Sequence, residues 1–153
     1  MKKVLKILGI LFLSIVVLFI FIAGFTYYKS SEYEKTAVPY IKENIPLLSN
    51  WDYEITKSLM VPTVLENAKE EDFKKIIHWF SKLGKLKNIE EPEFKNVSTR
   101  SSMSGGGSET IVTYKILAHY ENGDATIMMR LLDENNSFKI YYFNINSMAL
   151  LNE

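Results

Sequence analysis

The feature that most constrains this chain is an uncharged, apolar run at residues 7–28. These 22 residues include 15 that are Leu, Ile, Val or Phe. At about 1.5 Å of rise per residue, an α-helix of this length spans roughly 33 Å, which matches the hydrocarbon core of a bilayer. The sequence therefore predicts an N-terminal transmembrane helix at residues 7–28, with the lipid bilayer as its partner.

The charges on either side of this run predict its orientation. Lys2, Lys3 and Lys6 precede it, and every Asp and Glu follows it. Positive side chains are retained on the cytoplasmic side, and Tyr27 and Tyr28 suit the aromatic belt at the opposite interface. We expect a single-pass protein of the plasma or inner membrane, with a cytoplasmic N-terminus and an extracytoplasmic C-terminal domain.

A cleaved secretion signal is the alternative interpretation, because it also begins with basic residues before an apolar stretch. Its apolar core is usually about 7 to 15 residues long and is followed by an Ala-x-Ala-like site. The run in this chain is longer, and Ile22-Ala23-Gly24 matches such a site only in part. These features favour an anchor over a cleaved signal.

Composition excludes several classes of function for the rest of the chain. Of the 18 basic residues, three precede the span, which leaves 15 against 18 acidic residues, or about −3. A mildly acidic domain is a poor match for nucleic acid, whose binding depends on clustered Lys and Arg. The chain has no cysteine, which excludes disulfides, thiolate zinc sites and thiol nucleophiles. His78 and His119 stand in no catalytic or metal motif, so we expect no catalytic residue, metal site or cofactor.

Periodicity divides the chain into an anchor at residues 1–28, a juxtamembrane helix at 29–50 and an α+β domain at 51–153. The juxtamembrane helix is amphipathic over residues 30–48, with a kink or break near Val38 because Pro39 follows, and Pro46 helps to close it. The pattern at residues 51–65 fits either a short strand or a loose helix, both interrupted at Pro62, and we expect a helix there. A clear helix is expected at residues 69–83, with Gly84 as its C-cap.

The buried stripe of that helix and the strands that follow it complete the expected domain. The stripe is predicted to hold Phe73, Ile76, Ile77, Phe80 and Leu83. After Pro92 the pattern alternates, which predicts strands at residues 94–103, 110–120, 124–132 and 138–145. The glycines at 105–107 end the first strand, and Asn122-Gly123 is a strong hairpin signal. Helices packed on three to four antiparallel strands make an α+β fold.

The local sequences around these elements carry a resemblance. They are Phe80-Ser81-Lys82-Leu83-Gly84-Lys85-Leu86 at the end of the helix, Tyr114 in a strand, and the hairpin Tyr120-Glu121-Asn122-Gly123-Asp124. Over residues 51–148 the order of elements resembles the cystatin-like superfamily of nuclear-transport-factor-2-like domains. The resemblance implies a curved antiparallel sheet wrapped around one long helix. That superfamily includes enzymes with a conical pocket and also single-span scaffold subunits of bacterial secretion systems, and the resemblance assigns no site residue.

The leading hypothesis for function is a non-enzymatic binding or scaffold module. One face of the expected sheet is more apolar than a solvated face should be, which indicates that it is covered by the segment 30–65, by a second copy of the chain or by a protein partner. The candidate interaction residues are Ile111, Leu117, Met128, Arg130, Tyr141 and Phe143.

The alternative hypothesis is a small-ligand-binding protein or enzyme that uses a cone between the long helix and the sheet. The candidate pocket residues are Trp79, Tyr114, Met129 and Tyr142. This hypothesis requires a polar group among apolar walls, and the nearest candidates are Tyr114, His119 and Asp124.

Overall fold

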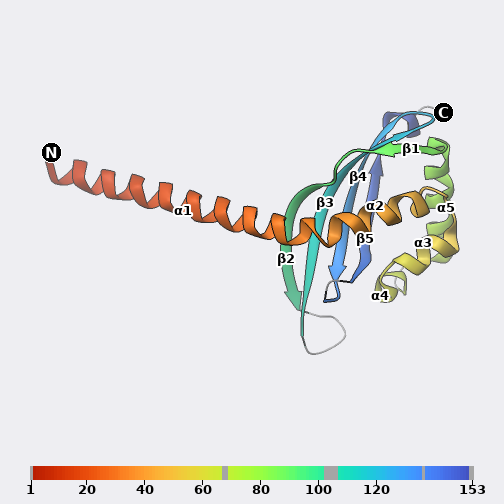
Figure 1. Cartoon of the computed structure of the whole chain (residues 1–153), viewed down its shortest axis with the longest axis horizontal. Coiled ribbons are helices and arrows are strands. Elements are labelled where there is room, and N and C mark those ends of the chain that lie inside the picture. Colours follow the sequence, from red (N-terminus) through yellow and green to blue (C-terminus); the bar gives the residue numbers. More distant parts are fainter. Residues whose placement is uncertain (1, 67–68, 102–106, 136, 152–153) are drawn as a thin grey trace.

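A computed structural model describes residues 2–66, 69–101, 107–135 and 137–151 of the 153-residue chain. One long helix projects from a body in which helices pack on an antiparallel sheet (Figure 1). The helices are α1 (Lys2–Glu34), α2 (Ala37–Leu48), α3 (Tyr53–Leu59), α4 (Pro62–Leu65), α5 (Glu70–Phe80) and the short 3-10 helices η1 (Ser81–Leu83) and η2 (Met148–Leu150). The strands are β1 (Leu86–Ile89), β2 (Glu93–Ser101), β3 (Ser108–Tyr120), β4 (Asp124–Asp133) and β5 (Phe138–Asn146). The predicted α+β class is confirmed.

Within the described residues the sheet has five strands, one more than the upper number expected from the sequence. Strands β1 and β2 both pair with β3, one after the other along the same edge, and β4 and β5 follow on its other side. The four residues of β1 are too few to show alternation, and no strand is predicted for them from the sequence. The predicted hairpin is confirmed, since β3 ends at Tyr120 and β4 begins at Asp124. The glycine run lies mostly outside the described residues.

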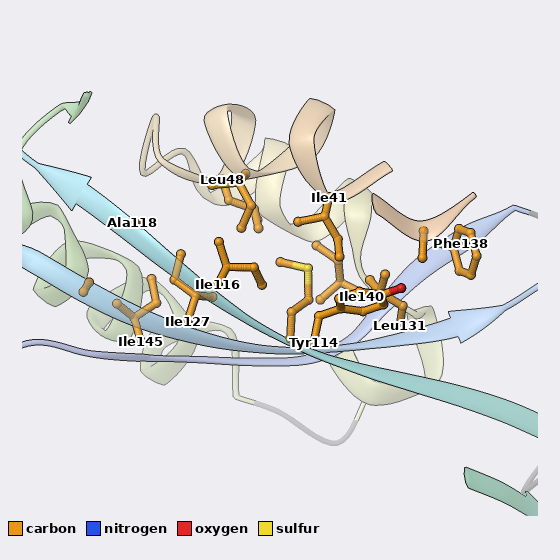
Figure 2. Packing of buried hydrophobic residues seen from close by; sticks show 14 of the residues in the cluster. Ile41, Leu48, Tyr114, Ile116, Ala118, Ile127, Leu131, Phe138, Ile140 and Ile145 are labelled. Atoms are coloured by element: carbon orange, nitrogen blue, oxygen red, sulfur yellow. The ribbon is translucent and has the colours of Figure 1, made fainter. Parts of the chain in front are cut away.

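The helix that covers the centre of the sheet is α2 rather than the expected helix α5. The buried face of α2 includes Ala37, Val38, Ile41, Ile45 and Leu48, all in one core with the strands. Figure 2 shows Ile41 and Leu48 pointing from this helix toward the row of buried side chains on the sheet.

Helix α5 contributes less to the core than its apolar stripe predicts. Ile77 and Phe80 are buried, and Leu83 follows in η1, but Phe73 is only partly buried and Ile76 is 45 % exposed. The predicted hydrophobic stripe was therefore one position too wide, because Ile76 is not packed against the core.

The expected break in the juxtamembrane helix lies just before Val38. Lys35 and Thr36 form a turn between α1 and α2, so Pro39 falls in the first turn of α2, where no intrahelical N–H bond is lost. Pro46 lies inside α2 instead of closing it. The same core holds Tyr33 from the last turn of α1, so the segment 33–48 packs together with the strands.

Within the part of the chain that the structure describes, no helix combines the length and the apolar content needed to cross a membrane.

Candidate functional site: the open face of the sheet

The two faces of the sheet differ in what covers them. Tyr114, Ile116 and Ile127 lie on the face packed against the helices and are almost completely buried. On the opposite face of β3 and β4, cross-strand pairs join Leu117 to Thr126, Lys115 to Met128 and Thr113 to Arg130. We call this second face the open face. Its exposed part includes Leu117, Arg130 and Tyr142.

Five of the six predicted interaction residues are on the open face or at its edge. Leu117 is 37 % exposed, Arg130 is exposed and Met128 is half-buried. Ile111 is buried in a small cluster with Val61 and Leu132, against which Tyr141 packs. These apolar contacts therefore cover one end of the open face. The rest of the face is accessible around Leu117, Met128 and Arg130.

The sixth residue, Phe143, is on the wrong face for this prediction. A register shift between Arg130 and Leu131 pairs Tyr142 with Arg130 but Ile140 with Leu131. The extra residue reverses the alternation, so Phe143 points into the helix-covered core, where its ring lies 6.1 Å from that of Phe80.

One end of the open face is held by a cluster around Arg100. Its guanidinium donates to the Glu109 carboxylate from Nε at 2.9 Å and from Nη2 at 2.7 Å, and to the Tyr141 hydroxyl from Nη1 at 2.6 Å. The same guanidinium lies 4.3 Å from the centre of the Tyr141 ring. The arrangement links β2, β3 and β5 across the open face, and these hydrogen bonds raise the pKa of Arg100.

The other end carries His119 between two carboxylates. Its Nδ1 is 2.7 Å from Asp124 and its Nε2 is 3.3 Å from Glu90. The hydrogen bond to Asp124 is the main reason why the pKa of His119 is raised above its usual value. Because both ring nitrogens contact carboxylates, His119 joins the β3–β4 hairpin to the segment after β1 through two ion pairs. An open groove beside it is lined in part by Leu117, Ser147 and the exposed Met148.

The predicted pocket residues are not brought together. Tyr114 and Met129 are cross-strand neighbours and fully buried on the helix-covered face. Tyr142 is 47 % exposed on the open face, and Trp79 is 40 % exposed on α5. No common pocket is formed by these four side chains.

The space between the helices and the sheet is filled by side chains. The cavity there has a volume of about 10 Å³ and is lined by residues that include Phe80, Ile127 and Phe143. A water molecule needs about 10 to 15 Å³ of such volume, so the cavity has no room for a larger ligand.

The structural roles of Arg100 and Glu90 were not predicted from the sequence. No structural role is predicted for residues 90–93 from the sequence, but Glu90 contacts His119, Glu91 pairs with Lys42 at 2.7 Å, and Glu93 begins β2. The signal for the Arg100–Glu109 pair was its opposite charges, because these two residues are directly opposite each other on β2 and β3. His78 is exposed on α5.

No family model, curated protein or solved structure matches the chain. The resemblance to the cystatin-like superfamily therefore stays a prediction from the sequence.

Proposed function

We propose that the protein is a membrane-anchored, extracytoplasmic binding module, with residues 7–28 as its anchor. The support is the sequence of this run and the surroundings of its side chains in α1. Phe12 is 70 % exposed, Phe19 67 % and Phe21 73 %, and every described side chain from 9 to 24 is exposed. Such a continuous apolar surface is unfavourable in water and favourable in lipid. The proposed span also takes in residues 7, 8 and 25–27, which lie outside the described side chains.

The chain's lack of cysteine allows a direct topology test. Lys3→Cys and Asn144→Cys are made separately in the full-length chain, and intact cells are treated with a maleimide that cannot cross membranes. We expect labelling at position 144 in intact cells and at position 3 only after lysis. Release of the intact chain by alkaline carbonate, or labelling at position 3 alone, would refute the anchored arrangement.

We further propose that the open face binds another protein. The observation that carries this proposal is a second sheet face that is covered only at one end, with Leu117, Met128 and Tyr142 accessible on the rest. Arg130 lies over the Tyr142 ring at 5.5 Å and is exposed, so it is placed to meet a carboxylate on a partner. An apolar and aromatic centre beside an arginine is a common composition for a protein interface.

Site-specific photo-crosslinking tests this face. A benzophenone amino acid replaces Tyr142 in one variant and Trp79, which is similarly exposed but on α5, in the control. We expect a discrete adduct from position 142 that disappears when Arg130→Glu is added and is absent from position 79. An adduct of twice the chain mass would show that the partner is a second copy of this chain. Equal labelling from positions 142 and 79 would reject the open face as an interface.

A further inference from the structure

A second surface of the domain lies between α2 and the first strand of the sheet. It is an open groove of about 670 Å³. We call it the α2–β1 groove, and its lining is Lys42, Pro46, Ser49, Asn50, Lys85, Leu86, Lys87, Asn88 and Ile89. It shares no residue with the open face residues Leu117, Met128, Arg130 and Tyr142, so it is an independent site.

One wall of the groove is a sheet edge. Strand β1 pairs with β3 on one side, and among the described residues no strand pairs with its other side. The opposite edge of the sheet is treated differently, because Met60 forms a bridge with Ile140 of β5 and the Val61 N–H donates to the Ile140 carbonyl at 3.0 Å. An unpaired edge offers backbone donors and acceptors to an incoming extended chain.

Both walls are held in place before any ligand binds. The indole N–H of Trp51 donates to the Gly84 carbonyl at 3.0 Å, which ties the end of α2 to the start of β1. The Lys85 N–H donates to the Glu121 carboxylate at 3.1 Å, and the Asn122 N–H donates to the Leu83 carbonyl at 3.0 Å. A groove that is already ordered loses little conformational entropy on binding.

The charge of the groove identifies its occupant. Lys42, Lys85 and Lys87 line it; Lys85 directly precedes β1, Lys87 is on β1, and both are exposed. Lys42 pairs with Glu91, but both side chains are exposed, so a carboxylate from a ligand replaces Glu91 at little cost. Edge-to-edge pairing of two copies would place lysines against lysines, which disfavours a second copy of this chain.

We propose that the α2–β1 groove binds an extended, acidic segment of a partner protein, which adds to the sheet as a strand beside β1. The backbone edge gives the pairing, and the lysines select carboxylate side chains. Edge lysines also serve simply to prevent aggregation, and the experiment separates the two roles.

The test uses a fluorescent peptide of four Glu-Val repeats and the full-length chain in dodecyl maltoside micelles, which keep the chain in solution whether or not α1 spans a bilayer. Two further peptides carry N-methyl groups on alternate residues, either on every Glu or on every Val. Only one set of amides can face β1, so we expect one methylated peptide to lose about tenfold in affinity and the other to lose less. The Lys-Val counterpart is expected not to bind.

Matched variants place the binding in the groove. Lys87→Glu is expected to weaken binding about tenfold, while Lys75→Glu, the same charge change at an exposed position of α5 outside the groove, leaves it unchanged. Glu91→Gln is expected to strengthen binding, because it frees Lys42. Equal loss with both methylated peptides, equal effects of the two lysine variants, or no saturable binding would each overturn the proposal. Arg130→Glu on the open face should leave peptide binding intact, so failure of that interface is distinguishable from failure of this one.

Discussion

Replacing Tyr114 by Phe is expected to stabilise the domain. Tyr114 lies among the buried side chains on the sheet (Figure 2). It is 1 % exposed on β3, and among the described residues its hydroxyl has no hydrogen-bond partner. Burial also raises the pKa of Tyr114 to about 12, so the group stays neutral at ordinary pH. An unsatisfied buried hydroxyl costs about 1 to 2 kcal/mol, and the void left by its removal costs only about 0.2 kcal/mol. The net gain is about 1 kcal/mol, which for a domain of about 120 residues is a rise in Tm of roughly 4 °C.

Tyr120→Phe is the matched control for this prediction. Tyr120 is on the same strand and the same face, and it is 2 % exposed, but its hydroxyl hydrogen-bonds to the Ser49 hydroxyl at 3.0 Å. Loss of the Tyr120 hydroxyl should destabilise the domain by about 1 kcal/mol. The Ser49 hydroxyl keeps its hydrogen bond to the Ile45 carbonyl. Urea unfolding of the full-length chain in detergent, followed by tryptophan fluorescence, measures both changes. If Tyr114→Phe destabilises as much as Tyr120→Phe, its hydroxyl has a partner and the reasoning is refuted.

Three further changes test other parts of the fold by the same unfolding assay. His119→Gln removes a group whose folded pKa is raised by Asp124. The wild type should therefore be more stable than the variant below about pH 6.5 and lose this advantage as pH rises through the raised pKa of His119. A stability difference that stays constant across pH contradicts the ion pairs of His119. Gly84→Ala should destabilise by about 1 to 3 kcal/mol, because Gly84 has φ +75° and a Cβ would lie 3.0 Å from a carboxylate oxygen; no loss would show that the turn adapts. Arg100→Lys keeps the charge but not the fork that bonds Tyr141, and a loss of about 1 kcal/mol is expected, whereas an unchanged stability would reject the cluster as a support of the sheet.

The elements with strong local signals were predictable from the sequence. The acidic first turn and Gly84 at the C-terminus marked α5 and η1 to within one residue. The alternating pattern located β3 and β4 and the hairpin at Asn122-Gly123, since an amphipathic strand and a tight turn are properties of a few consecutive residues. Three of the candidate interaction residues, Leu117, Met128 and Arg130, lie on the accessible part of the open face, and their role in binding stays a prediction.

What failed depended on contacts between distant segments. The bulge near Tyr141 inverts the second half of β5 and moves Phe143 to the core, and no residue type in the strand itself signals the extra position. The α2–β1 groove arises because β1 pairs with the C-terminal end of β3. This pairing is determined by the register of the two strands and not by local propensity. The four candidate pocket residues are not brought together for the same reason, since Trp79 and Tyr142 were grouped with Tyr114 and Met129 by apolar character alone.

The proposed anchor and the domain share one rigid element. Tyr33, in the last turn of α1, is buried; its hydroxyl donates to Asp133 at 3.0 Å, and its ring packs edge-on against Phe138. Helix α1 is continuous from Lys2 to Glu34. Under the proposed anchoring, the six residues at 29–34 correspond to about 9 Å of helix between the end of the span and the domain. A domain held this close and in a set orientation reaches only what lies at the membrane surface, which favours partners that are themselves attached to the same membrane.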